Sequence, residues 1–390
     1  MKNLKAALSV PGLLVLAATF AGPASAETKG ELEKRVSALE AKLAAAPDAA
    51  AVKTLLGFDV SIYGYAHGAL VIDDTYDLGL NAGGIGGVLP TTNEDENSRL
   101  HAYQSRLGLR GSKETDAGKL SFNIEGDFYG GGGGTFRLRH AYGSLGGLLV
   151  GQTWSAFGPV EGSPSGQIDF GGPAGNPSWR TAQIRYTYKF SDKFSGIVSV
   201  EEDNKSSYAD RVALVGALHW VDGKTAVRLA GISRKLEWSG GTSDAWGVNI
   251  GGSVAPWEGG LIQANFTTGK GIAGIMPYSG FVTATPGASG ISDLDSNGDA
   301  IDTKAFTVGI SHAVNSKFDV AATYGMYEFD NYAGALGTST ETIETTFLTA
   351  KYKPTANVMM GLEYIIADKS LFDGSSLKNN RIQASVQFSF

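Results

Sequence analysis

The chain has 390 residues, of which 42% are apolar, 18% charged and 10% aromatic, with 54 glycines, no cysteine and a net charge of −7. This composition excludes a disordered chain, a disulfide-stapled scaffold and any site built on thiolates. The acidic balance gives no reason to expect nucleic-acid binding. The glycines follow no three-residue period, which excludes collagen and is typical of many short elements joined by turns, so we expect a β-rich protein.

Residues 1–26 have the pattern of a secretory signal peptide. A basic start precedes an apolar stretch over 6–21, and Ala-Ser-Ala at 24–26 offers a cleavage site. No later run reaches the roughly 18 apolar residues that a membrane-spanning helix needs. An exported chain can still cross a membrane as a closed barrel, because closure satisfies every backbone group.

A heptad pattern occupies residues 27–47. Its apolar positions are Leu32, Val36, Leu39 and Leu43. Two heptads are marginal in isolation, so we expect this helix to associate with copies from other subunits and to end in a linker over 48–57. The alternative is a single amphipathic tail.

From residue 58 to residue 390 the hydrophobic period changes to two. The last segment shows it most clearly, with one apolar face made of Ile382, Ala384, Val386, Phe388 and Phe390. A soluble sandwich has no need for an apolar and a polar face in every strand up to a terminal aromatic residue. A membrane barrel turns the apolar face to lipid and the polar face to water, so the pattern favours an all-β transmembrane barrel.

Sixteen segments show this alternation: 58–74, 99–112, 118–129, 135–145, 147–155, 181–190, 193–202, 210–221, 224–237, 243–256, 260–269, 303–313, 317–328, 343–353, 356–367 and 379–390. An even number places both chain ends on the periplasmic side, and about 16 strands leave a water-filled channel. Connections after even-numbered strands are short apart from one medium break. Several after odd-numbered strands are long, at 75–98, 156–180, 270–302 and 368–378. This asymmetry is typical of outer-membrane barrels.

The alternation also assigns side chains to the lumen. In 99–112, Tyr103, Leu107 and Leu109 are expected to face lipid, which turns Arg106 and Arg110 toward water. The same argument gives the other lumen-facing charges: Arg137, Arg139, Arg185, Glu125 and Asp127.

Some of these charges should neutralise each other. Folding the hairpin at Gly132 places Arg137 near Asp127 and Arg139 near Glu125, as cross-strand neighbours. The remaining arginines have no such partner in this register and form a candidate positive wall for permeating anions: Arg106, Arg110 and Arg185. The alternative is that acidic residues from loops pair with them.

The loop 156–180 has no periodicity of its own, and a loop of this length is typically functional or mobile. It carries Glu161, Asp169 and the pair Trp179-Arg180 among Gly, Pro and Ser. We expect it to fold inward and narrow the channel. The alternative is an outward surface loop.

Four motifs carry a resemblance to a known family: Arg137-Leu138-Arg139-His140-Ala141-Tyr142, Gly151-Gln152-Thr153-Trp154-Ser155, Asp169-Phe170-Gly171-Gly172-Pro173 and Gln183-Ile184-Arg185-Tyr186. Together with the order of signal, heptads and barrel, they resemble the DcaP-like porins of Gram-negative outer membranes. The resemblance implies a trimeric 16-stranded porin surrounded by outer-membrane lipid and lipopolysaccharide, with a periplasmic coiled coil, an inward third loop and a preference for anionic solutes such as dicarboxylates. It supports four positions as pore or constriction residues: Arg137, Arg139, Asp169 and Arg185.

An acidic segment places oxygen ligands at alternate positions, as a Ca²⁺ loop requires: Asp293, Asp295, Asn297 and Asp299. Lys304 stands where the bidentate glutamate of such a loop should fall. An exposed acidic turn without an ion is the alternative, and no other cofactor is expected.

Enzymatic motifs are missing from the sequence. Glycines 130–134 lack the Lys-Ser/Thr of a phosphate loop, and the five histidines show no metal-binding spacing. We therefore expect a passive outer-membrane diffusion channel that favours small anions. The alternatives are a structural or adhesive barrel without an open channel, and a barrel hydrolase whose Ser and His meet at a rim.

Overall fold

The computed structural model describes residues 57–158, 161–203, 212–276 and 292–390. The signal sequence, the heptad positions Leu32, Val36, Leu39 and Leu43, and nearly all of the linker lie outside these residues. No helix among the described residues is long and apolar enough to cross a bilayer.

The described chain forms strands and two short 3₁₀ helices. Their bounds are β1 (Asp59–Asp73), η1 (Ala82–Gly87), β2 (Asn97–His101), β3 (Arg106–Thr115), β4 (Gly118–Gly130), β5 (Thr135–Leu145), β6 (Leu148–Trp154), β7 (Arg180–Lys189), β8 (Phe194–Glu201), β9 (Ala213–Asp222), β10 (Thr225–Trp238), β11 (Gly241–Val254), β12 (Gly260–Lys270), η2 (Ala273–Ile275), β13 (Asp302–Ala313), β14 (Phe318–Phe329), β15 (Thr340–Thr355), β16 (Val358–Leu371) and β17 (Ser376–Ser389).

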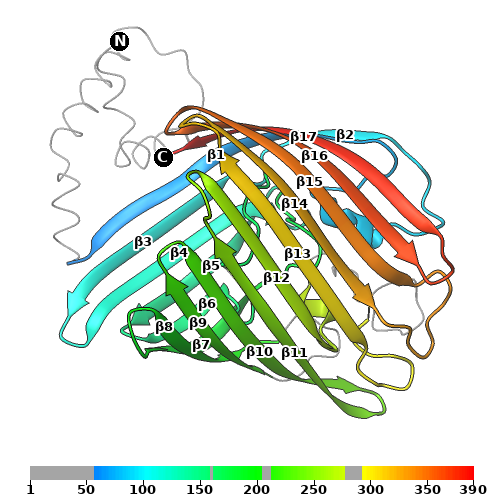
Figure 1. The fold of residues 1–390 in the computed structure, drawn as a ribbon, viewed down its shortest axis with the longest axis horizontal. Helices are drawn as coiled ribbons and strands as arrows, with labels where there is room; N and C mark the ends of the chain where they lie inside the picture. Colours follow the sequence, from blue (N-terminus) through cyan, green and yellow to red (C-terminus); the bar gives the residue numbers. More distant parts are fainter. Residues whose placement is uncertain (1–56, 159–160, 204–211, 277–291) are drawn as a thin grey trace, which may run out of the picture.

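These strands close into a barrel (Figure 1). From β3 onward each strand pairs antiparallel with the next, and β17 returns to pair with β1, with Tyr65 opposite Ser389 and Asp73 opposite Arg381. The strands β2 and β3 pair with different halves of β1, so they share one position in the wall. The wall therefore has 16 strand positions, as the sequence predicts.

The break between β2 and β3 corrects one prediction. Residues 102–105 form a turn that shifts the alternation, and Tyr103 stacks on His101 with ring centres 5.2 Å apart. Its ring also lies 6.3 Å from that of Tyr129, which contacts an inward-folded loop. The prediction that Tyr103 faces lipid is wrong, because a period of two holds only along an uninterrupted strand.

The outward face elsewhere agrees with the prediction. Leu107, Phe136 and Ile184 have exposed fractions of 50%, 53% and 58%, and their strand neighbours point into the barrel. Large apolar side chains exposed over so many strands form the apolar belt of a membrane barrel.

The two rims differ as expected, with one exception. Turns such as 146–147, 223–224 and 356–357 are short, whereas 74–96 and 155–179 are long. The predicted long connection at 368–378 is wrong. The pairing of β16 with β17 continues through Asp368 opposite Lys378 to Ser370 opposite Ser376, so the hairpin extends beyond the apolar pattern and leaves only 372–375 as a loop.

The barrel interior contains an apolar region as well as polar surface. Phe347 and Ile365 point inward from the wall, yet both are fully buried. They belong to one apolar cluster with residues of three loops that fold into the barrel: Ile85, Phe157 and Ile272. Strand alternation alone predicts a polar lumen, and it missed this cluster because the covering residues come from the loops.

Candidate functional site at the constriction

The loop 155–179 crosses the barrel interior, which confirms the inward interpretation. The Gln263 side chain on β12 donates to the Ser163 carbonyl at 2.7 Å. Further along, the Asp169 backbone N–H donates to Glu363 on β16 at 2.8 Å. Both anchors stand on strands far around the wall from the ends of the loop. Polar side chains on the distant wall therefore bind its backbone and fix it across the lumen.

The start of the loop is tied to the wall by a carboxylate. Glu201 on β8 accepts the Ser155 hydroxyl at 2.6 Å and the Ala156 N–H at 2.8 Å. Farther along, Gly175 has a φ of 73° and passes so close to the Met326 carbonyl that a Cβ would overlap it. Glycine is needed there for both reasons, which explains part of the loop's small-residue composition.

Between this loop and the wall formed by β3–β7 lies a cavity of about 590 Å³. The residues that set its chemistry are Arg106, Arg137, Arg139, Arg180, Trp154 and Asp169. Four guanidinium groups thus line the cavity, against the single carboxylate of Asp169. The surplus of positive charge on this wall makes the cavity a candidate anion site.

The paired arginines lie as the sequence predicts. Arg137 donates to Asp127 through Nε and Nη2 at 3.0 and 2.9 Å. Arg139 donates to Glu125 at 2.7 Å and to Asp127 at 2.8 Å, because a register shift between β4 and β5 places it between the two acids. These carboxylates lie behind the arginines and fix the direction in which the guanidinium groups point.

One loop residue that the sequence analysis did not select completes this arrangement. The Phe170 ring stacks on Tyr129 with centres 4.2 Å apart. It also lies 5.2 Å from the Arg137 guanidinium and 5.4 Å from that of Arg139. The loop is therefore held against the cationic wall by cation–π contacts. The sequence pointed to Phe170 only through the motif that begins with Asp169-Phe170.

The prediction that Arg106 has no acidic partner is wrong. Its Nε lies 3.4 Å from Glu125 Oε1, and its guanidinium stands 5.1 Å from the Tyr65 ring centre. Arg106 is directly opposite Asp127 on β4, so Glu125 is its diagonal neighbour and within reach of a long side chain.

Arg110 and Arg185 were predicted to have no acidic partner. Within the described residues, neither has a carboxylate at ion-pair distance. Arg110 donates to the Ser61 hydroxyl at 3.1 Å and stands 5.1 Å from the Tyr63 ring centre. It lines a second cavity of about 470 Å³ that also contains Lys119. Arg185 faces inward from β7, outside both cavities.

Arg180 is the residue that the prediction missed. It is the first residue of β7, and its guanidinium lies 4.5 Å from the Trp154 ring centre. No ion pair holds it within the part of the chain that the structure describes. The sequence shows that Arg180 follows Trp179 at the end of the long loop. The alternation could not assign it to the lipid or the lumen face, because the predicted strand began at residue 181.

The two acids predicted for the loop are both engaged. Glu161 Oε1 lies 3.1 Å from His219 Nε2 on β9, and its Oε2 lies 3.8 Å from Arg228 Nη1 on β10. Glu161 therefore ties the loop to the wall. It does not line the 590 Å³ cavity.

Asp169 is the buried acid of the site. It accepts the N–H groups of Gly171 at 2.7 Å and Ala82 at 3.1 Å, and Arg381 Nη1 lies 3.6 Å from its Oδ2. Burial raises the pKa of the Asp169 carboxyl above its usual value, while Arg381 and the two N–H groups oppose that rise. Asp169 thus joins two of the inward loops, 74–96 and 155–179, to the wall.

The acidic segment at 293–299 forms a turn in which the carboxylates of Asp293 and Asp295 have protein partners. Asp295 accepts the N–H groups of Asn297 and Asp299 at 2.8 and 2.9 Å. Asp293 accepts the Gly274 N–H at 3.0 Å and lies 3.5 Å from Arg234 Nη1. Within the described ranges no group of three acidic or histidine side chains is arranged to hold a metal ion. The Ca²⁺ site at Asp293, Asp295, Asn297 and Asp299 stays a prediction.

A closed antiparallel barrel of 16 strand positions, with an apolar belt outside and a long loop across the lumen, defines an outer-membrane protein of the porin class. Within this class, residues 58–213 match the family model of the DcaP outer membrane protein. All four motifs that carry the resemblance lie in this range, so the resemblance to DcaP-like porins is confirmed. No curated protein sequence matches the chain.

Solved structures support the same fold. The outer membrane channel DcaP of Acinetobacter baumannii is 24% identical, with 86% of this chain and 98% of that chain covered and a TM-score of 0.75. An anion-selective porin from Comamonas acidovorans is 16% identical, with coverage of 85% and 100% and a TM-score of 0.59. OprB of Pseudomonas putida is 12% identical, with coverage of 87% and 96% and a TM-score of 0.56.

Proposed function

We propose that this outer-membrane porin is a passive diffusion channel that favours small anions, dicarboxylates among them. The observation that carries the proposal is the lining of the cavity at the inward loop, where four guanidinium groups face one carboxylate. The relative from Comamonas acidovorans, described as anion-selective, adds support by analogy of fold.

The mechanism is electrostatic. A positive wall inside a low-dielectric sheath raises the local concentration of anions without the tight binding that would stop flow. Arg137 and Arg139 are fixed by the acids behind them, so they contribute a rigid part of the wall. Arg180, whose guanidinium lies over the Trp154 ring, offers donors that no protein carboxylate occupies within the described residues. The second cavity, lined by Arg110 and Lys119 against the single acid Asp59, supplies another site with a positive surplus on the same wall.

The test is a planar-bilayer recording of the full chain, with the reversal potential measured under a KCl gradient. We expect open-channel current and a reversal potential of the sign given by chloride permeation. Cation selectivity would overturn the role of the arginines. Absence of conductance would favour a structural or adhesive barrel.

We further propose a homotrimer, in contact with outer-membrane lipid and lipopolysaccharide, in which residues 27–47 form a periplasmic coiled coil after cleavage of residues 1–26. The heptad positions Leu32, Val36, Leu39 and Leu43 support this proposal. Replacing Val36 and Leu39 by Asp should weaken the oligomer, as measured by native mass spectrometry in detergent. An unchanged oligomer would favour a single amphipathic tail.

A further inference from the structure

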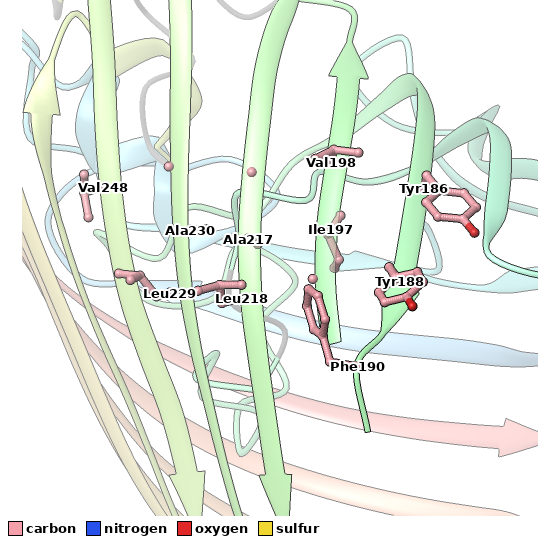
Figure 2. Close-up of a pocket in the computed structure, with 13 residues that line it drawn as sticks. Tyr186, Tyr188, Phe190, Ile197, Val198, Ala217, Leu218, Leu229, Ala230 and Val248 are labelled. Atoms are coloured by element: carbon pink, nitrogen blue, oxygen red, sulfur yellow. The ribbon is translucent and has the colours of Figure 1, made fainter. Parts of the chain in front are cut away.

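A groove runs along the outer face of the barrel over β7–β11. It has a volume of about 540 Å³. Figure 2 shows its walls, which include Tyr186, Tyr188, Phe190, Val198, Leu218, Leu229 and Val248. Nearly all of the lining is hydrocarbon, and the groove lies outside the lumen and apart from the constriction.

The floor of the groove is made by two outward glycines that pair directly, Gly216 on β9 and Gly231 on β10. Val198 is opposite Gly216 on one side, and Val248 is opposite Gly231 on the other. Across four neighbouring strands, two side chains are therefore missing between two valines. This gap makes the outer surface concave.

None of the residues that the structure describes requires glycine at these two positions. Neither residue has a positive φ. A Cβ on Gly216 would lie 4.0 Å from the nearest atom, the Ile197 carbonyl oxygen, and one on Gly231 would lie 3.8 Å from the Gly247 carbonyl oxygen. Both are ordinary contacts. Glycine weakens a strand interior and often marks a place where another molecule approaches closely.

The surroundings of the groove identify its occupant. The outward side chains beside it belong to the apolar belt, for example Leu214 and Ile250, which are 57% and 50% exposed. One end lies at the rim of short turns, which is the periplasmic rim in outer-membrane barrels. There the turns that precede β8 and β10 carry the exposed lysines Lys193 and Lys224, and Lys193 Nζ lies 2.9 Å from Asp222.

We propose that this groove binds one acyl chain of an anionic phospholipid of the periplasmic leaflet. The chain lies over Gly216 and Gly231, and the lipid phosphate reaches the lysines at the rim. A hydrocarbon chain has no hydrogen-bonding groups, so it matches an apolar lining and gains dispersion contacts on three sides where a flat wall would give them on one. A negatively charged headgroup matches the ammonium group of Lys224 and shares that of Lys193 with Asp222.

The experiment uses the full chain, delipidated in detergent and titrated with dioleoyl phosphatidylglycerol, with bound lipid counted by native mass spectrometry. The variant is Gly216→Leu with Gly231→Leu, which fills the floor. The matched control is Gly68→Leu on β1, because Gly68 is also exposed and has no atom within 4 Å of a Cβ. Resistance of the folded band to unfolding in SDS shows that each variant retains the barrel.

We expect one lipid per chain to be retained by the unmodified chain and by the Gly68→Leu control, and its affinity to fall roughly tenfold in the double variant. Replacing Lys193 and Lys224 by Gln should weaken phosphatidylglycerol and leave dioleoyl phosphatidylcholine unaffected. Equal lipid retention in the folded double variant would overturn the proposal. A change of oligomeric state without a change in bound lipid would also overturn it, because a second copy would then be the occupant.

Discussion

Arg381 on β17 donates two hydrogen bonds to Asp73 on β1, at 2.8 and 2.7 Å, across the seam where the last strand meets the first. Both side chains are buried. The same guanidinium donates to the Gly79 carbonyl of the loop 74–96 at 3.0 Å and lies near Asp169 of the loop 155–179. One cation therefore links barrel closure to the placement of these two inward loops.

Replacing Arg381 by Leu should destabilise the barrel by about 3–5 kcal/mol, because two buried carboxylates then lose their cation. The measurement is urea unfolding in detergent micelles, followed by the shift of the folded band in gels. The double change of Arg381→Leu with Asp73→Leu should recover part of the loss, since it removes one of the stranded acids. Equal loss in both variants would show that the pair does not act as a unit.

Replacing Arg180 by Gln should lower the ratio of anion to cation permeability. One charge at contact distance from an ion in water-like surroundings is worth about 1 kcal/mol, which is roughly a fivefold change. The reversal potential under a salt gradient measures the ratio. Lys235→Gln is the control, because Lys235 is exposed and paired with Asp244 outside the cavity. If both variants behave alike, Arg180 is off the path of the ion.

Replacing Glu363 by Ala should loosen the inward loop. This carboxylate accepts the N–H groups of Ile168 and Asp169 at 2.9 and 2.8 Å, and hydrogen bonds to a charged group contribute about 1.5–3 kcal/mol each. We expect larger and noisier single-channel currents. Glu114→Ala, at an exposed strand end, should leave the current unchanged. An unaltered conductance in the Glu363 variant would mean that its other anchors suffice.

Anion selectivity should rise as the pH falls through the acidic range. Because the pKa of Asp169 is raised by burial, its carboxyl takes up a proton at a higher pH than an ordinary aspartate. Protonation removes the one negative charge that lines the cavity, and the positive surplus grows. Reversal potentials recorded against pH should show this rise in the unmodified chain. The Asp169→Asn variant should start from the higher selectivity and lack this step.

Much of the fold could be predicted, because a hydrophobic period of two residues indicates directly which face of each strand contacts lipid. Strand positions, their even number and the pairing of Arg137 with Asp127 follow from that pattern and from hairpin geometry. The partner of Arg106 could not be obtained in the same way, since Glu125 reaches it diagonally and the register had to be known within one residue. The placement of Tyr103 failed for a related reason, because no pattern announces the turn at 102–105.

The site beyond the strands was harder to predict. Arg180 and Phe170 belong to a loop, and loop residues have no periodicity to assign them a face. The hydrogen bonds that hold the loop come from Gln263 and Glu363, which are remote in sequence. The sequence could indicate that the loop turns inward, but the wall that receives it depends on tertiary structure.

The apolar cluster inside the barrel limits how this pore can be engineered. Because Phe347 and Ile365 are shielded by the inward loops, shortening the loop 74–96 to widen the passage would expose an apolar surface in place of a hydrophilic one. Water would then meet hydrocarbon halfway through the membrane, and a broader bore could conduct ions less well than the narrow native one. The inner loops and the wall must be redesigned together.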